Sequence, residues 1–258
     1  MAPPPVNAAF GALLAAALLG TAFDRRAVAV VVAAAMLPDL DAVASLAVPG
    51  ATNALLHAVW LPLAVGVVLR WDTRVRDASR LRERFGRRGV RVAWVALAAF
   101  LVAGVGPDLF GREGVNLLYP LHDTYYLVDG AFLFSTEDGV VQTFVSGGAG
   151  GPGILPLETL GTTDSHAIPT FANPDGRPGL SLGAERELAL VRTGWQLVVV
   201  ASAVALLAAR FRWEGKERAA GGSTDAADGA DDIDDIDDID ADDIDADDID
   251  SGDPEVGR

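Results

Sequence analysis

Five apolar stretches occupy most of the first 210 residues, and each is about long enough to cross a lipid bilayer as a helix. A hydrocarbon core of about 30 Å requires about 20 helical residues, because each residue rises about 1.5 Å along the helix axis. The stretches are approximately residues 6–23, 27–48, 53–69, 92–110 and 188–209. Backbone polar groups inside a bilayer must be satisfied within the segment, so we expect an all-α integral membrane bundle of about five transmembrane helices. No basic segment precedes the first stretch, so we expect it to be a retained helix and not a cleaved signal peptide.

Charged residues between the apolar stretches indicate how the bundle is oriented. The connection 70–91 contains nine Arg against three acidic residues, a net charge of +6. Short basic segments follow the first and fifth stretches, whereas the long connection 111–187 contains ten acidic residues and three Arg. Because cytoplasmic loops of membrane proteins collect Lys and Arg, the sequence predicts a multi-pass protein of the cell membrane. Its N-terminus and residues 111–187 are expected outside, and its C-terminal tail in the cytoplasm.

These features divide the chain into four predicted parts. Residues 6–110 form four transmembrane helices with the Arg-rich cytoplasmic loop 70–91, residues 111–187 form an extracytoplasmic insert, residues 188–210 form the fifth transmembrane helix, and residues 219–258 form a disordered acidic tail. The insert is expected to be partly β, because "TYYLVDGAFLFSTEDGVVQTFV" alternates like a hairpin that turns near "TEDG". The glycine-rich "SGGAGGPG" that follows predicts a flexible hinge.

The acidic tail carries the whole net charge of the protein. Residues 221–258 contain 16 Asp and one Glu against one Arg, which equals the net charge of −16 of the entire chain. Such a run repels itself and buries too little apolar surface to fold. Together with 19 Arg against a single Lys, the excess of Asp is typical of proteins from halophilic archaea. The chain contains no cysteine, which excludes disulfides and thiolate metal sites.

Polar residues from four predicted helices fall at a similar depth, near the predicted outer surface. They are Asn7, Asp39, Asp41, His57 and Asp108. A carboxylate near the centre of a bilayer costs roughly 2.5–3.5 kcal/mol on insertion scales, so the paired aspartates need a compensating partner. A proline directly before the pair disturbs the helix, which allows both carboxylates to face one cavity.

This cluster predicts a divalent metal site. The expected ligands are Asp39, Asp41, His57 and Asp108. Carboxylates and imidazole are ligands of Mg²⁺, Mn²⁺ and Zn²⁺, and an oxygen-rich set favours the first two. Asn7, His122 and His166 are additional candidates for lining the site, since the two histidines of the insert can fold back over it. A structural explanation also stays open, in which the carboxylates cap short helices and His57 is a buried core residue.

Four segments resemble, in their order, the membrane-bound metal-dependent hydrolase family of the YdjM type (domain of unknown function 457). They are "NAAFGALLAAALLG", "MLPDLDAV", "ATNALLHAVWLPL" and "DLFGREGVNLLYPLHDTYYLVDG". The resemblance covers residues 6 to about 130 and implies a metal held by the same two aspartates, His57 and Asp108. Two histidines of the family pattern are replaced by Asn7 and Gly104. We therefore expect Asn7 to border the site and Gly104 to leave a gap in its wall.

Two functions stay open at the level of the sequence. The first is a membrane-embedded, metal-dependent hydrolase-like protein whose site at the outer membrane surface acts on a lipid or another extracytoplasmic substrate. The alternative is a non-catalytic integral membrane protein whose polar cluster is structural or binds a cation. A transporter is less well supported, because the polar groups gather at one surface and no internal repeat is visible. Nucleic acid is not an expected partner, since the chain has no basic nucleic-acid-binding face.

Overall fold

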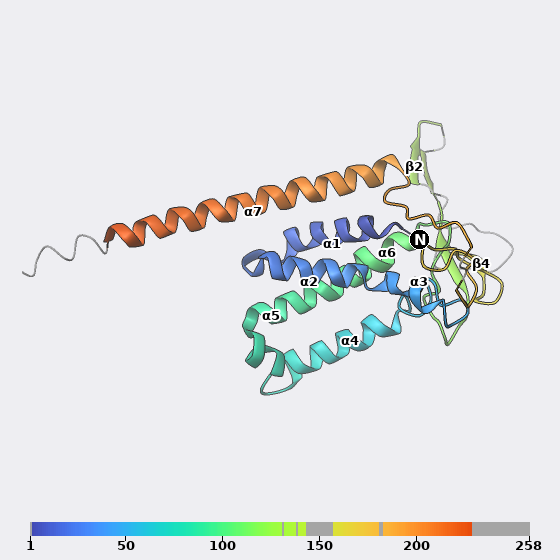
Figure 1. Cartoon of the computed structure of the whole chain (residues 1–258), viewed down its shortest axis with the longest axis horizontal. Coiled ribbons are helices and arrows are strands. Elements are labelled where there is room, and N and C mark those ends of the chain that lie inside the picture. The colour runs from blue at the N-terminus through green and yellow to red at the C-terminus, as the bar shows by residue number, and fades with distance from the viewer. Residues whose placement is uncertain (1, 131, 138, 143–156, 181–182, 229–258) are drawn as a thin grey trace, which may run out of the picture. The chain divides into compact units, whose positions relative to one another are not determined.

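The computed structural model describes residues 2–130, 132–137, 139–142, 157–180 and 183–228, and these residues are mostly helical (Figure 1). The chain divides into two compact units, residues 1–211 and residues 212–258. Among the described residues, the second unit contributes only the last part of a long helix. The helical bundle and the candidate site both belong to the first unit.

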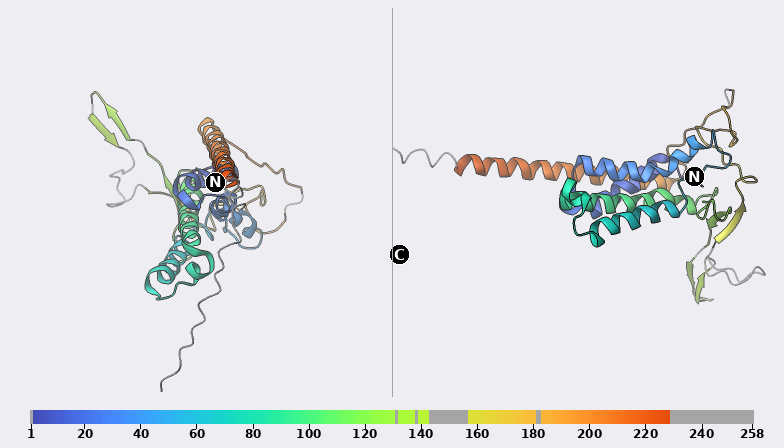
Figure 2. Two further views of the ribbon diagram at one scale, coloured as in Figure 1. Left: turned by 90° about the vertical axis from the view of Figure 1, so that its left-hand side faces the viewer. Right: turned by 90° about the horizontal axis from the view of Figure 1, so that it is seen from below.

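The helices follow the apolar stretches of the sequence. The longer ones are α1 (Pro4–Leu18), α2 (Arg25–Met36), α4 (Trp60–Arg70), α5 (Arg80–Ala99) and α7 (Gly194–Asp228). The shorter ones are η1 (Gly20–Ala22), η2 (Pro38–Leu40), α3 (Asp41–Ala44), the π-helices η3 (Trp71–Val75) and η4 (Phe100–Val105), and α6 (Gly106–Leu109). Helices α1, α2, α5 and α4 lie side by side, with α3, α6 and the strands at one end, which we call the strand end (Figures 1 and 2).

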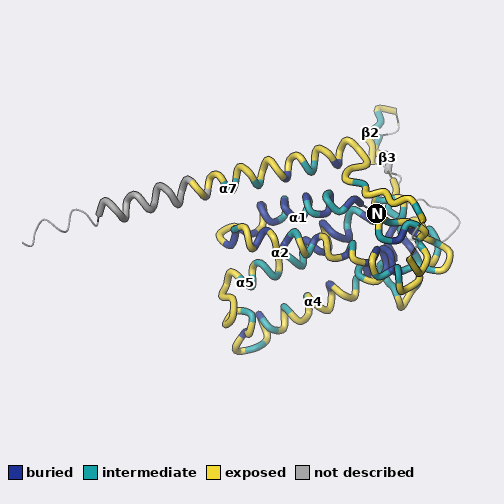
Figure 3. Tube along the Cα trace, in the orientation of Figure 1, coloured by how far each residue is buried: buried dark blue, intermediate teal, exposed yellow. Residues whose placement is uncertain are grey.

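A core of small and branched apolar side chains joins α1, α2 and α5. Its buried members include Ala15, Val31, Ala35, Val95 and Ala99. Small residues let helix backbones approach closely, and a Cβ atom added at Gly11 would lie only 2.7 Å from the Cβ of Ala35. Burial is concentrated where α1, α2 and α5 meet, whereas α4 is largely exposed along its length (Figure 3).

Two helical segments of the described chain are long and apolar enough to cross a membrane. They are Arg80–Leu109 and Gly194–Trp213. The bent pair formed by α2 and Pro38–Ala44, with an angle of 46°, is a third candidate if it counts as one span. Helix α1 is apolar but has 15 residues, and α4 has 11. The structure therefore supports a helical membrane protein, while the number of five spans stays a prediction.

The third apolar stretch becomes helical later than the sequence predicts. A helix is expected from residue 53, but α4 begins at Trp60. Asn53 adopts a positive φ of 54°, its backbone oxygen accepts the N–H of Asn116 at 2.8 Å, and its Nδ2 donates to the oxygen of Gly114 at 2.9 Å. These long-range bonds occupy groups that a helix would use, so the segment before α4 forms turns. His57 consequently lies in a turn and not in the first turns of a helix.

The last helix also differs from the prediction at both ends. Helix α7 begins at Gly194 and not near residue 188, and it continues to Asp228. Residues 219–228, which the sequence assigns to the acidic tail, continue this helix. The preceding "EGKERAA" consists mostly of strong helix formers, and extending an existing helix costs little compared with starting one. The rest of the predicted tail, residues 229–258, lies outside the described residues.

Four short strands make the insert partly β, as predicted. They are β1 (Tyr125–Val128), β2 (Phe132–Ser135), β3 (Gly139–Gln142) and β4 (Leu157–Gly161). Strands β2 and β3 pair antiparallel on either side of "TEDG", which confirms the predicted hairpin. Strand β1 pairs with the distant β4, also antiparallel, and local alternation gave no sign of this partner. The predicted hinge, residues 146–153, lies outside the described residues.

Candidate metal centre

The bend between α2 and α3 sends the two aspartates in different directions. Helix α2 ends at Met36, and Pro38 then opens η2 because it lacks the N–H that a continuing α-helix needs. Asp39 lies within η2, whereas Asp41 is the first residue of α3. The change of helix type between them means that the two carboxylates contact different partners.

Asp41, His57 and Asp108 form a buried, hydrogen-bonded chain. Nδ1 of His57 lies 2.9 Å from Oδ2 of Asp41, and its Nε2 lies 3.0 Å from Oδ2 of Asp108. All three residues have zero solvent exposure. The other oxygen of each carboxylate accepts a backbone N–H, from Leu56 to Asp41 at 2.8 Å and from Ala2 to Asp108. Buried charges are costly unless they are paired, and here each has at least two donors or charge partners.

Asp108 reaches this chain from the π-helix η4 and the short α6 that follows it. Gly104 lies in η4 and packs against the bend between α2 and η2. A Cβ atom added to Gly104 would lie 2.7 Å from the oxygen of Ala35 and 2.8 Å from Cγ of Pro38. The expected gap at this position is therefore absent, because the end of α2 fills it. The close approach also leaves no room for the histidine that the resemblance places here.

Asn7 borders the site, as expected, through the second aspartate of the pair. Its Nδ2 donates to both oxygens of Asp39, at 3.0 and 3.2 Å. Asn7 is fully buried, and its Oδ1 has no hydrogen-bond partner within the described part of the chain. A buried amide oxygen without a donor is costly, at about 1–3 kcal/mol. This orphaned acceptor is therefore suited to a cation or to a donor from a ligand.

Three of the four predicted ligands lie around one point. One ligand atom each from Asp39, His57 and Asp108 can be chosen so that all lie within 4.8 Å of one another. Asp41 lies on the other side of the imidazole, hydrogen-bonded to Nδ1. This is the arrangement in which a carboxylate fixes the tautomer and ring orientation of a metal-binding histidine. The side chains of Asp39, His57 and Asp108 thus meet around one point, whereas Asp41 lies on the other side of the imidazole and is not one of this group.

The two histidines of the insert lie elsewhere. Nε2 of His166 is 2.8 Å from the backbone oxygen of Glu113, and its ring packs against Tyr125 at a centroid distance of 4.9 Å. His122 is exposed and stacks near Tyr126. Neither belongs to the group of potential ligands found among the described residues.

Asp123, next to His122 in the sequence, holds the insert together. Burial tends to raise the pKa of Asp123, but hydrogen bonds from the hydroxyl and N–H of Thr163 and from Asn116 lower it overall. The carboxylate thus joins the segment before β1 to the turn after β4. Its role is local to the insert, which makes Asp123 a useful control for the buried carboxylates.

A cavity of about 380 Å³ reaches the site at Asp39. Its other walls come from the segments 169–174 and 185–192, which lie far from Asp39 in the sequence. Nothing in the local sequence pattern links these segments to the aspartate pair, so this part of the wall could not be predicted. Arg192 is part of it and also borders a larger cavity on the other side of Ala2.

Comparisons with protein-family models, with curated proteins and with solved structures returned no match. The resemblance to the YdjM-type hydrolases accordingly rests on the quoted segments and stays a prediction.

Proposed function

We propose that the chain is a membrane-embedded, metal-dependent hydrolase-like protein and that Asp39, His57 and Asp108 hold a divalent cation. The observation that supports this most is the group of three ligand atoms within 4.8 Å, two of them on fully buried residues. Asn7 contacts Asp39 through Nδ2, and its own Oδ1 is orphaned. Two carboxylates, one imidazole and one amide oxygen form an oxygen-rich set, which suits Mg²⁺ or Mn²⁺ better than Zn²⁺. The donor set thus fits the cation that the resemblance implies.

Each residue of the site has a role in this proposal. When bound, a divalent cation lowers the pKa of a coordinated water and polarises an ester, which is the chemistry of hydrolysis. Asp41 would accept a hydrogen bond from Nδ1–H of His57 and so leave the lone pair of Nε2 to the cation in the metal-bound state. Asn7 holds both oxygens of Asp39 through Nδ2. Asp41, His57 and Asp108 are fully buried, whereas Asp39 lines a cavity.

The test is Mn²⁺ binding to the detergent-purified protein, measured by electron paramagnetic resonance of the free ion. We expect about one bound ion per chain in the wild type and at least tenfold weaker binding in Asp39→Ala. Asp41→Asn removes no ligand but changes the hydrogen-bond partner of His57. It is expected to weaken Mn²⁺ binding 10- to 100-fold, the range for residues that hydrogen-bond to a metal ligand. Asp123→Asn, in the insert, is the matched control and should bind like the wild type. The absence of stoichiometric Mn²⁺ from a folded wild-type protein would remove the proposal.

A non-catalytic membrane protein is the second candidate, and one observation favours it. The chain Asp41–His57–Asp108 satisfies its own hydrogen bonds without any cation. Such a network can serve stability alone. The Mn²⁺ measurement tests the structural form of this candidate, because a purely structural network gives no saturable binding that depends on Asp39. A non-catalytic protein that binds a cation is distinguished by Mn²⁺ binding without hydrolysis of an ester.

The proposed orientation places the strand end, and with it the site, outside the cell. The support is the net charge of +6 in residues 70–91 against the acidic residues of 111–187. The chain has no cysteine, so single cysteines can be introduced directly. A membrane-impermeant maleimide should label Thr136→Cys in intact cells, and Arg87→Cys only after permeabilisation. Both positions are exposed. Labelling of the two cysteines from the same side would contradict the orientation.

A further inference from the structure

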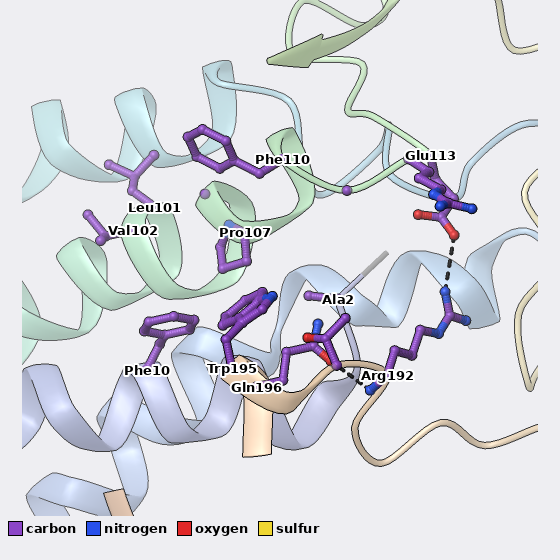
Figure 4. Close-up of a pocket in the computed structure, with 14 residues that line it drawn as sticks. Ala2, Phe10, Leu101, Val102, Pro107, Phe110, Glu113, Arg192, Trp195 and Gln196 are labelled. Atoms are coloured by element: carbon purple, nitrogen blue, oxygen red, sulfur yellow. Dashed lines mark hydrogen bonds and ion pairs between the residues drawn. The ribbon is translucent and has the colours of Figure 1, made fainter. Parts of the chain in front are cut away.

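A large cavity lies beside the candidate metal centre and has two chemically different ends. It has a volume of about 1080 Å³ and lies between α1, the segment from η4 to residue 113, and the start of α7 (Figure 4). This is the upper end of the volume range typical of small-molecule sites in proteins. In Figure 4, the apolar side chains gather at one end of the cavity and the charged pair Glu113–Arg192 at the other.

The apolar end belongs to the candidate membrane spans. Leu101 and Val102 come from the span Arg80–Leu109, and Trp195 comes from the span Gly194–Trp213. Phe10 of α1 faces Trp195 with the ring centroids 6.4 Å apart. Aromatic residues such as Trp concentrate at the level where the hydrocarbon meets the headgroups. This end therefore offers an apolar slot at the depth of the lipid chains.

The charged end begins where those spans end. Arg112 follows the first span by three positions, and Arg192 precedes the second by two. Arg192 forms an ion pair with Glu113 at 3.2 Å, while Arg112 is exposed and makes no hydrogen bond or ion pair within the described part of the chain. Two guanidinium groups against one carboxylate leave this end with one excess positive charge. A positively charged cavity end attracts anionic lipid headgroups.

We propose that this cavity binds a membrane lipid with an anionic phosphate headgroup. The chains of the lipid lie in the apolar end, alongside Phe10 and Trp195, and the phosphate contacts Arg112 and Arg192. The cavity passes from an apolar end to a charged end, as a phospholipid passes from its acyl chains to its headgroup. The position of the change coincides with the ends of two candidate spans, which is the depth that a headgroup occupies in a bilayer.

The cavity also identifies a substrate class for the proposed hydrolase, and this extension rests on the proposed function. Ala2 and Pro107 line the cavity. The N–H of Ala2 donates to Asp108, and Pro107 directly precedes that residue. The wall of the cavity between its two ends therefore lies next to a residue of the candidate metal centre. A lipid held there presents the ester bonds near its headgroup to the site, so the substrate class is an anionic membrane phospholipid.

The test uses quenching of tryptophan fluorescence by lipids with dibrominated acyl chains, in detergent micelles that contain the purified full-length protein. The difference in fluorescence between the wild type and Trp195→Phe gives the contribution of Trp195, the tryptophan in the cavity. We expect half-maximal quenching of Trp195 at a concentration of brominated phosphatidylglycerol several times lower than that of brominated phosphatidylcholine. Arg112→Gln should reduce this preference about fivefold, as expected for one basic residue at a headgroup. Because Arg112 is exposed, this variant is expected to fold.

Three controls make the outcome decisive. Arg177→Gln removes an exposed arginine of the insert outside the cavity and should keep the full preference. Trp60 is partly exposed on α4, and its signal, isolated with Trp60→Phe, should be quenched equally by both lipids. Asp123→Asn changes a carboxylate outside the cavity and should leave the lipid preference unchanged. Equal preference at Trp60 and Trp195, or an unchanged preference in Arg112→Gln, would mean that only surrounding lipid is sensed, and it would overturn the proposal.

The same experiments separate this proposal from the proposed function. A protein that binds Mn²⁺ through Asp39 but shows no headgroup preference at Trp195 keeps the metal centre and loses the lipid site. A protein that prefers the anionic lipid but binds no Mn²⁺ keeps the lipid site and loses the hydrolase.

Discussion

Replacing His57 with alanine is expected to lower the free energy of unfolding by about 3–5 kcal/mol, the range for breaking a buried ion pair. The imidazole is the shared partner of Asp41 and Asp108, at 2.9 and 3.0 Å, and all three side chains are fully buried. Its removal takes away the imidazole that both carboxylates contact. The backbone N–H groups of Leu56 and Ala2 still donate to Asp41 and Asp108, respectively, but they carry no full charge.

The measurement is chemical or thermal unfolding in detergent, followed by circular dichroism. His122→Ala is the matched control, because His122 is exposed and lies outside the site. Surface substitutions of this kind change stability by no more than about 0.5 kcal/mol. Equal stability of the two variants would show that the buried chain does not hold the strand end together.

Replacing Gly104 with alanine is the second large expected effect, a destabilisation of about 1–3 kcal/mol from overpacking. The added Cβ would lie 2.7 Å from the backbone oxygen of Ala35 and 2.8 Å from Cγ of Pro38, so backbone at the end of α2 must move. The same bend carries Asp39. We therefore expect Gly104→Ala to weaken Mn²⁺ binding as well as stability.

Gly106 provides the matched control two residues later. A Cβ atom there would lie 3.6 Å from the oxygen of Leu101, which is an ordinary contact. Gly106→Ala is expected to be neutral or slightly stabilising, since alanine restricts the unfolded chain more than glycine does. Both variants are compared with the wild type in one unfolding series and one Mn²⁺ titration. Similar losses at both positions would argue against a specific close approach at Gly104.

Much of the candidate site could be predicted because depth in a bilayer is a local property of the sequence. The number of residues between a position and the end of its apolar stretch sets the depth of that position in the bilayer. By this measure, a similar depth is expected for Asn7, Asp39, His57 and Asp108. The structure does bring them together at the strand end. Depth does not determine the direction of a side chain, so the sequence grouped Asp41 with the ligands although it lies behind His57.

The helical character, the partly β insert and the β2–β3 hairpin were determined by the sequence itself, because each follows from composition or from contacts within a few residues. Only the tertiary structure decided the rest. Bonds from Asn53 to residues 114 and 116 delay the start of α4, and the partner of β1 lies about 30 residues away in β4. The close approach of Gly104 to Ala35 likewise depends on two helices far apart in the chain. Such pairings depend on packing between distant segments, and a single sequence carries no local signal for them.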